Sequence, residues 1–165
     1  MRDVAADAKK LKRALQGRFP TAAFSVRMSR GTGYGNVYVS WEDGPTERVV
    51  RSITDAAEGK RFDAMQDLGY HVPAAFPDGS ESSLGYILTS RRTSRRFAER
   101  LLRAVGDYWN GPGSPIPAMG SHPNGEWRVE FGDAPIRPDL RETWNEAIFR
   151  AASDARLYRR EDAHA

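Results

Sequence analysis

The sequence predicts a single α+β domain, in which an antiparallel, hairpin-based sheet of about four strands packs against about four helices. Two observations support this class: apolar residues recur every three or four positions in some segments, and at every second position in others. The length of 165 residues suits one hydrophobic core. Cysteine is absent, which excludes both a disulfide framework and a thiolate metal site.

A change in the spacing of apolar residues near the N-terminus predicts one helix followed by two strands. Apolar residues at helical spacing predict an amphipathic helix that begins near Val4 and stops near Gly17. Residues 24–29 and 36–41 then alternate between apolar and polar side chains, with the glycine-rich segment 31–35 between them. This arrangement predicts a β-hairpin with one buried face and a glycine-containing tip.

The middle of the chain predicts a second helix and a third strand. The segment from Asp43 to Thr46 has the turn and cap residues of a helix start, and Gly59 is the expected stop. Residues 60–84 are expected to be mostly loop, with a short element around 62–70. The third strand is expected at 85–89.

Two further helices and one strand complete the expected fold. A helix capped by Thr93 or Ser94 runs to Trp109, residues 127–131 alternate as a fourth strand, and Pro138 introduces the last helix.

We divide the chain into three parts from this pattern. Residues 1–109 are the expected α+β core, 110–117 a Pro/Gly linker, and 118–165 a strand–helix extension that packs on the same core.

Basic residues are concentrated in the first two thirds of the chain. Residues 1–109 hold 18 lysines and arginines against 13 acidic residues, whereas 110–165 hold 7 against 9. Arginine supplies 21 of the 25 basic residues. A positive surplus of this kind favours a polyanionic partner, although charge alone does not identify one.

The segment SRRTSRRFAERLLR (90–103) is the strongest candidate binding feature. On a helical projection four of its arginines fall within a sector of about 80°, opposite Phe97, Leu101 and Val105. Such a stripe attracts phosphates by charge and by guanidinium geometry. An ordinary solvated helix face and a surface for an acidic protein are the alternatives. The candidate nucleic-acid or partner-binding residues are Arg91, Arg92, Arg95, Arg96, Arg100 and Arg103 on this segment, with Arg30 and Tyr34 at the hairpin tip.

Tyr38 and Arg27, on the exposed face of the hairpin, extend this surface if the elements align.

Other motifs give no catalytic centre. The glycine-rich segment 31–35 lies between two strands, so a hairpin tip explains it better than a phosphate-binding loop. Asp63, Asp67 and His71 are four residues apart and would share a face of a helix as a weak metal or hydrolase candidate; solvated loop charges are the alternative. We therefore expect no enzyme activity, no metal and no cofactor.

The region from Ala8 to Val50, AKKLKRALQGRFPTAAFSVRMSRGTGYGNVYVSWEDGPTERVV, followed by Phe62–Asp67 (FDAMQD), carries a family resemblance. It resembles the large polyvalent protein associated domains, specifically the twenty-ninth of that series. The similar segments cover about residues 8–67, and GYILTSR closes them. The chain departs from the family pattern at Ala64, where glycine is common, and in an extension after Asn110.

The resemblance implies a setting in phages and conjugative elements, without implying a catalytic activity. It leads us to expect a non-enzymatic binding module of a phage, plasmid or integrated element that contacts nucleic acid through the arginine-rich helix. The alternative is a protein-binding antagonist of a host defence system that acts by surface occlusion.

The sequence predicts the cellular location of the protein but not its oligomeric state. Charges in the N-terminal segment and the lack of a long apolar run predict the cytoplasm of the bacterial host cell, with no membrane partner. The oligomeric state is left open. Within the fold, Trp41 is expected to pack on the buried sheet face, and Asp43 to Thr46 to form the turn and cap.

Overall fold

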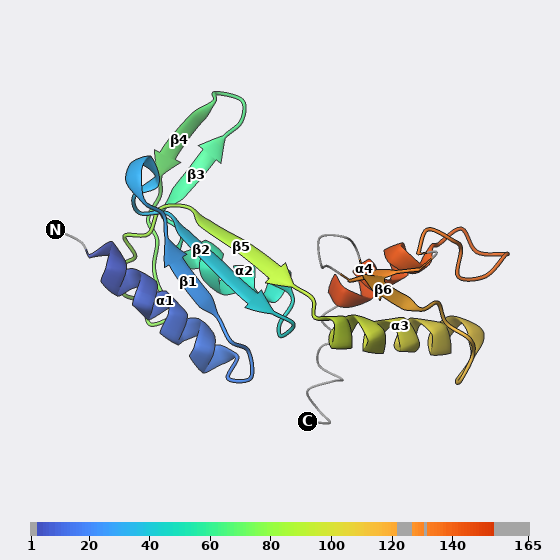
Figure 1. Ribbon diagram of the computed structural model, residues 1–165. Helices are drawn as coiled ribbons and strands as arrows, with labels where there is room; N and C mark the ends of the chain where they lie inside the picture. The colour runs from blue at the N-terminus through green and yellow to red at the C-terminus, as the bar shows by residue number, and fades with distance from the viewer. Residues whose placement is uncertain (1–2, 122–126, 131, 154–165) are drawn as a thin grey trace. The chain divides into compact units, whose positions relative to one another are not determined.

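The computed structural model describes residues 3–121, 127–130 and 132–153 (Figure 1). Helices and strands mix along the chain, which confirms the α+β class. The chain divides into two compact units, one ending at Arg92 and one beginning at Thr93, which we call unit 1 and unit 2. Each unit has its own cluster of buried apolar side chains.

Unit 1 contains most of the strands. Its elements in chain order are α1 (Val4–Arg18), β1 (Ser25–Met28), the short 3-10 helix η1 (Gly31–Gly33), β2 (Val37–Glu42), α2 (Glu47–Ala57), β3 (Lys60–Asp63), β4 (Leu68–His71) and β5 (Ile87–Arg92). The predicted hairpin and both predicted helices are confirmed, with boundaries shifted by a few residues.

The main sheet has three strands in the order β1-β2-β5. β1 and β2 pair antiparallel as predicted, whereas β2 and β5 pair parallel. The predicted antiparallel hairpin is therefore confirmed, whereas β5 joins the sheet as a parallel strand. A parallel pair requires the chain to cross over, and α2 with the segment after it provides that crossover.

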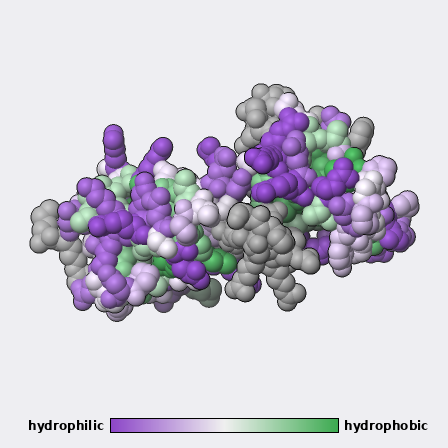
Figure 2. All heavy atoms as spheres, turned by 90° about the horizontal axis from the view of Figure 1, so that it is seen from below, coloured by the Kyte–Doolittle hydropathy of each residue, from purple (hydrophilic) through white to green (hydrophobic). Residues whose placement is uncertain are grey.

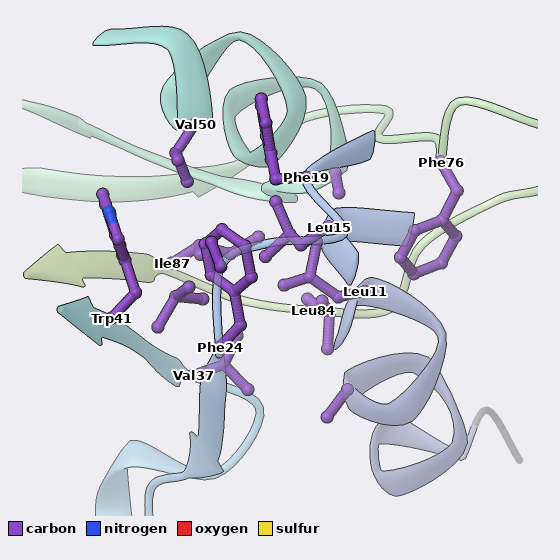
Figure 3. Close-up of a cluster of buried hydrophobic side chains, with 14 of the residues drawn as sticks. Leu11, Leu15, Phe19, Phe24, Val37, Trp41, Val50, Phe76, Leu84 and Ile87 are labelled. Carbon is purple, nitrogen blue, oxygen red and sulfur yellow. The ribbon is translucent and has the colours of Figure 1, made fainter. Parts of the chain in front are cut away.

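The core of unit 1 lies between this sheet and the two helices (Figure 3). Alternate residues of β2 are buried, as the sequence predicts, and Trp41 is the largest of them. Leu11 and Leu15 of α1 and Val50 of α2 meet them from the helices. Both helices thus cover the same face of the sheet, and the opposite face is left to the outward-pointing residues of the three strands.

β3 and β4 form a separate two-stranded hairpin that extends away from the main sheet (Figure 1). Asp67, with a positive φ of 50°, makes the reversal, and Asp63 Oδ1 accepts the backbone N–H groups of Met65 and Gln66. The short element expected within 62–70 is therefore the end of β3, the turn and most of β4.

The turn between β2 and α2 is held by two side chains from the sheet. Asp43 and Gly44 both have positive φ values, 53° and 56°. The Trp41 indole N–H donates to the Pro45 carbonyl at 2.9 Å. Arg91 donates from Nε to the Asp43 carbonyl at 2.9 Å and from Nη2 to the Gly44 carbonyl at 3.2 Å.

Thr46 occupies the N-cap position of α2, but its hydroxyl makes no cap hydrogen bond. The predicted cap position is therefore confirmed, although the Thr46 side chain does not complete the cap. The backbone turn, fixed by Trp41 and Arg91, sets the start of α2 instead.

Unit 2 contains α3 (Arg95–Asn110), β6 (Met119–Ser121), β7 (Trp127–Val129) and α4 (Trp144–Ser153). α3 shares a buried cluster with Trp144, Ile148 and Val129. The contacts of α3 thus join it to the C-terminal part of the chain, and the division falls after Arg92 instead of at the expected linker 110–117. The predicted fourth strand pairs with β6 in a sheet of its own, and Phe131 lies outside the described residues.

α4 begins six residues later than Pro138, where the sequence places its start. Thr143 and Glu146 form a reciprocal capping box: the Thr143 N–H donates to the Glu146 carboxylate, and the Glu146 N–H donates to the Thr143 hydroxyl. A Thr-x-x-Glu pattern is visible in the sequence and is the signal that locates this start.

An exposed ion pair connects α1 to the loop before β5 and gives unit 1 a pH dependence. Lys10 Nζ lies 2.7 Å from Asp78 Oδ2, and Ser80 donates to the same carboxylate. The Lys10 hydrogen bond, followed by those from Ser80, lowers the pKa of Asp78 from 3.8 to about 2.

A lowered folded pKa means that the Asp78 carboxylate stabilises the fold above about pH 4 and loses that effect as the pH falls toward 2. We expect Asp78→Asn to be less stable than the wild type at about pH 5, and the difference to shrink toward pH 2. Urea unfolding at a series of pH values measures it. A difference that does not change with pH would contradict this assignment.

Candidate functional site

α3 is amphipathic, as the sequence predicts. Ser94 caps its N-terminus, because the Ser94 hydroxyl accepts the Phe97 N–H at 3.2 Å. The predicted apolar stripe of Phe97, Leu101 and Val105 is buried in unit 2. The opposite side of the helix is therefore presented to solvent.

Three arginines, Arg96, Arg100 and Arg103, form what we call the α3 arginine face. All three are exposed and line a shallow, open depression of about 410 Å³. The same depression is lined by Glu99, Ala104 and Asp107. Figure 2 shows hydrophilic residues gathered over the part of unit 2 that faces the viewer. The face therefore offers several guanidinium groups around a concave surface.

The carboxylates near this face are partly engaged elsewhere. Glu99 Oε1 lies 2.8 Å from Arg95 Nε, and Arg95 also donates to the Met119 carbonyl at 2.9 Å. Asp107 accepts the Gly113 N–H at 3.1 Å. Arg95 is thus held against its own unit, and its charge is offset by Glu99, which leaves the α3 arginine face as the cationic surface of this helix.

The arginines of the face keep their own local contacts. Arg100 lies over the Phe97 ring at 5.5 Å, and Arg103 Nη1 donates to the Ser114 carbonyl at 2.9 Å. The Arg103 contact orients that side chain without neutralising it, since the Ser114 carbonyl carries no charge. A guanidinium group has five N–H donors, of which this hydrogen bond uses one.

The other predicted site residues belong to unit 1. Arg91 uses its guanidinium to hold the Asp43–Gly44 turn, so its position assigns it a structural role. Arg92 is exposed at the end of β5, and Arg30 and Tyr34 are exposed in the connection between β1 and β2. The structure thus brings Arg95, Arg96, Arg100 and Arg103 together on one helix and places the remaining four in another unit.

The outward face of the main sheet carries a second surface. Strand register places Arg27, Tyr38 and Leu88 in one row across β1, β2 and β5. Tyr38 is 50% exposed and Leu88 48%. The alternation in the sequence predicts the outward side chains of Arg27 and Tyr38. Leu88 is missed, because its place in the row depends on the parallel pairing of β5.

The β3–β4 hairpin exposes apolar side chains. Met65 at its tip is 95% exposed, and three more large apolar or aromatic residues on its strands are about half exposed; these are Phe62, Leu68 and Tyr70. Exposed apolar groups gathered on one protruding element are typical of surfaces that contact other proteins.

The weak metal candidate is not assembled. Asp63 and Asp67 lie at the turn of the hairpin, whereas His71 pairs with Lys60 at its other end, three residues away along the strand. Over that distance a strand extends by about 10 Å. Within the described ranges, no group of three His, Asp or Glu side chains is placed to hold a metal ion.

A family model described as Large polyvalent protein associated domain 29 matches residues 3–95. This match spans more than half of the chain. The chain belongs to this family. Large polyvalent protein associated domain 29 is a domain of polyvalent proteins of mobile elements, so the expected family is confirmed. Neither the curated proteins nor the solved structures contain a match to the chain.

The candidate surfaces differ in whether they lie inside the family match. Large polyvalent protein associated domain 29 covers unit 1, including the outward sheet face and the β3–β4 hairpin, and ends at Arg95. The α3 arginine face lies beyond it. Among the helices of the described residues, none is long and apolar enough to cross a membrane.

Proposed function

We propose that this protein is a non-enzymatic module of a mobile genetic element that binds nucleic acid through the α3 arginine face. The observation that carries the proposal is the clustering of Arg96, Arg100 and Arg103 around one open depression on the solvent side of α3. Phosphate groups are the ligands that such a cluster suits best, because guanidinium groups bind them bidentately.

The contact we propose is to the backbone of a nucleic acid and does not depend on base sequence. Each phosphate that an arginine neutralises releases a condensed counterion, which makes binding depend on salt concentration. The nearby Glu99 is paired with Arg95, which limits its repulsion of phosphates. Asp107 weakens one end of the face, so the phosphate contacts are expected nearer Arg96 and Arg100.

The triple variant Arg96→Ala, Arg100→Ala, Arg103→Ala tests this proposal. We expect it to lower the affinity for a 20-base-pair duplex by about tenfold or more at low salt, and the slope of log affinity against log salt to fall by about three. Fluorescence anisotropy with a labelled duplex across a salt series measures both quantities.

The matched control removes the same charge from α1. Lys9, Lys12 and Arg13 are exposed there, and their replacement by alanine changes the net charge equally. We expect this control to bind nearly as well as the wild type. An unchanged affinity in the α3 variant, or an equal loss in both variants, would contradict the proposal.

A second candidate function is supported by the β3–β4 hairpin. Met65 and its apolar neighbours suit a protein partner, as in an antagonist that covers the surface of a host defence complex. If this candidate is correct, the chain forms a complex with a host protein. That complex survives nuclease treatment and is lost in Met65→Asp. The α3 variant would then retain the complex, which separates the two functions.

A further inference from the structure

We infer that the outward face of the main sheet in unit 1 binds the unpaired bases of single-stranded nucleic acid, with Tyr38 as the stacking platform. This site is separate from the α3 arginine face, lies inside the family match, and does not depend on the proposed function of α3. It also predicts single-stranded nucleic acid as the ligand, whereas a helix that binds phosphates does not distinguish single strands from duplexes.

The first argument is the position of Tyr38 in the sheet. β2 is the central strand and is paired on both sides, to Arg27 of β1 and to Leu88 of β5 at the position of Tyr38. The flanking inward residues Val37 and Val39 are fully buried. The backbone that carries Tyr38 is therefore fixed, while its ring stays half exposed. Because the backbone is fixed, only the side-chain torsions of Tyr38 have to be ordered when a base stacks on its ring.

The second argument is the space around the ring. The next row across the three strands consists of Ser25, Ser40 and Ser90. Small side chains beside Tyr38 leave a planar base access to the ring, and their hydroxyl groups match the hydrogen-bonding edges of a base. Leu88 supplies an exposed apolar neighbour in the same row as Tyr38.

The third argument is charge. Arg27 lies in the same row as Tyr38, Arg30 follows it in the connection to β2, and Arg92 ends β5 on the same face. Within these three strands the only acidic residue is Glu42, which lies opposite Arg92. The phosphates are therefore expected nearer Arg27 and Arg30. Aromatic stacking combined with flanking cations is the chemistry of single-strand binding surfaces.

A duplex does not fit this chemistry, because its bases are already stacked on one another and cannot reach the Tyr38 ring. A second protein surface would more often meet a broad apolar patch than a tyrosine beside a row of serines. The observations thus favour a single strand as the occupant.

The test measures binding of the full chain to a labelled 12-nucleotide oligothymidine and to a matched duplex. We expect Tyr38→Ala to weaken single-strand binding about tenfold and to leave duplex binding unchanged. Tyr38→Phe keeps the ring and should bind within about twofold of the wild type. Tyr70→Ala, which removes another exposed tyrosine, is the matched control and should bind as the wild type does.

Three outcomes with Tyr38→Ala overturn the inference. Unchanged single-strand binding in Tyr38→Ala excludes stacking on this ring, and an equal loss for both nucleic acids indicates a general electrostatic effect. Self-association that disappears in Tyr38→Ala, without single-strand binding, identifies a second copy of the chain as the occupant. If the α3 variant binds normally while Tyr38→Ala does not, the proposed function of α3 fails and this inference stands.

Discussion

Trp41→Ala is expected to lower the free energy of unfolding of unit 1 by about 3–5 kcal/mol. Trp41 is 3% exposed and packs on Phe24, with ring centroids 5.5 Å apart. Its indole N–H also donates to the carbonyl of Pro45, which is buried. The substitution therefore leaves a cavity, and it also leaves a buried carbonyl without its donor.

Denaturant unfolding followed by circular dichroism measures the loss for Trp41→Ala. Trp41→Phe keeps most of the packing but removes the hydrogen bond, so its loss should be intermediate. Tyr38→Ala lies on the outward side of the same strand and should change stability by less than about 0.5 kcal/mol. A loss below about 1 kcal/mol in Trp41→Ala would show that the β2–α2 turn does not depend on this side chain.

Leu101→Ala is expected to lower the free energy of unfolding of unit 2 by about 2–5 kcal/mol. Leu101 is 1% exposed and belongs to the buried cluster that contains Trp144 and Ile148. The removed methyl groups leave a cavity between α3 and α4. Because unit 1 has its own core, its stability should change little.

Amide hydrogen exchange locates the effect of Leu101→Ala. Faster exchange is expected in α3 and α4, with β2 and α1 still protected. Arg96→Ala, on the exposed side of α3, is the control and should leave exchange unchanged in both units. Equal loss of protection in both units would mean that the chain unfolds as one cooperative domain, as the sequence alone predicts.

The elements that the sequence predicts well are those that depend on local periodicity. α1, β1 and β2 follow from the spacing of residues such as Leu11 and Val39, because burial on one side of a helix or strand repeats within a few residues. The parallel pairing of β5 does not follow from its own sequence, since it depends on where α2 returns the chain. β6 is only three residues long, so its sequence is too short to show the alternation that marks a strand.

The candidate site could likewise be predicted only where its features depend on residues close together in the sequence. A helical projection treats Arg91 and Arg92 as part of one helix with Arg96, although α3 begins only at Arg95. Their spacing cannot reveal that Arg91 reaches the carbonyls of Asp43 and Gly44, about fifty residues earlier in the chain. The exposed arginines of α3 are predictable, because their periodicity and the Ser94 cap are local.

The short connection between the two units has a consequence for replacing the C-terminal part of the chain. Only Thr93 and Ser94 separate the end of β5 from the start of α3, and all the strand partners of β5 precede this joint. A gene fusion that exchanged everything after Ser94 would leave the ladder of β5 intact. Unit 1 would thus keep its own buried cluster and its strand pairs if a different segment followed Ser94.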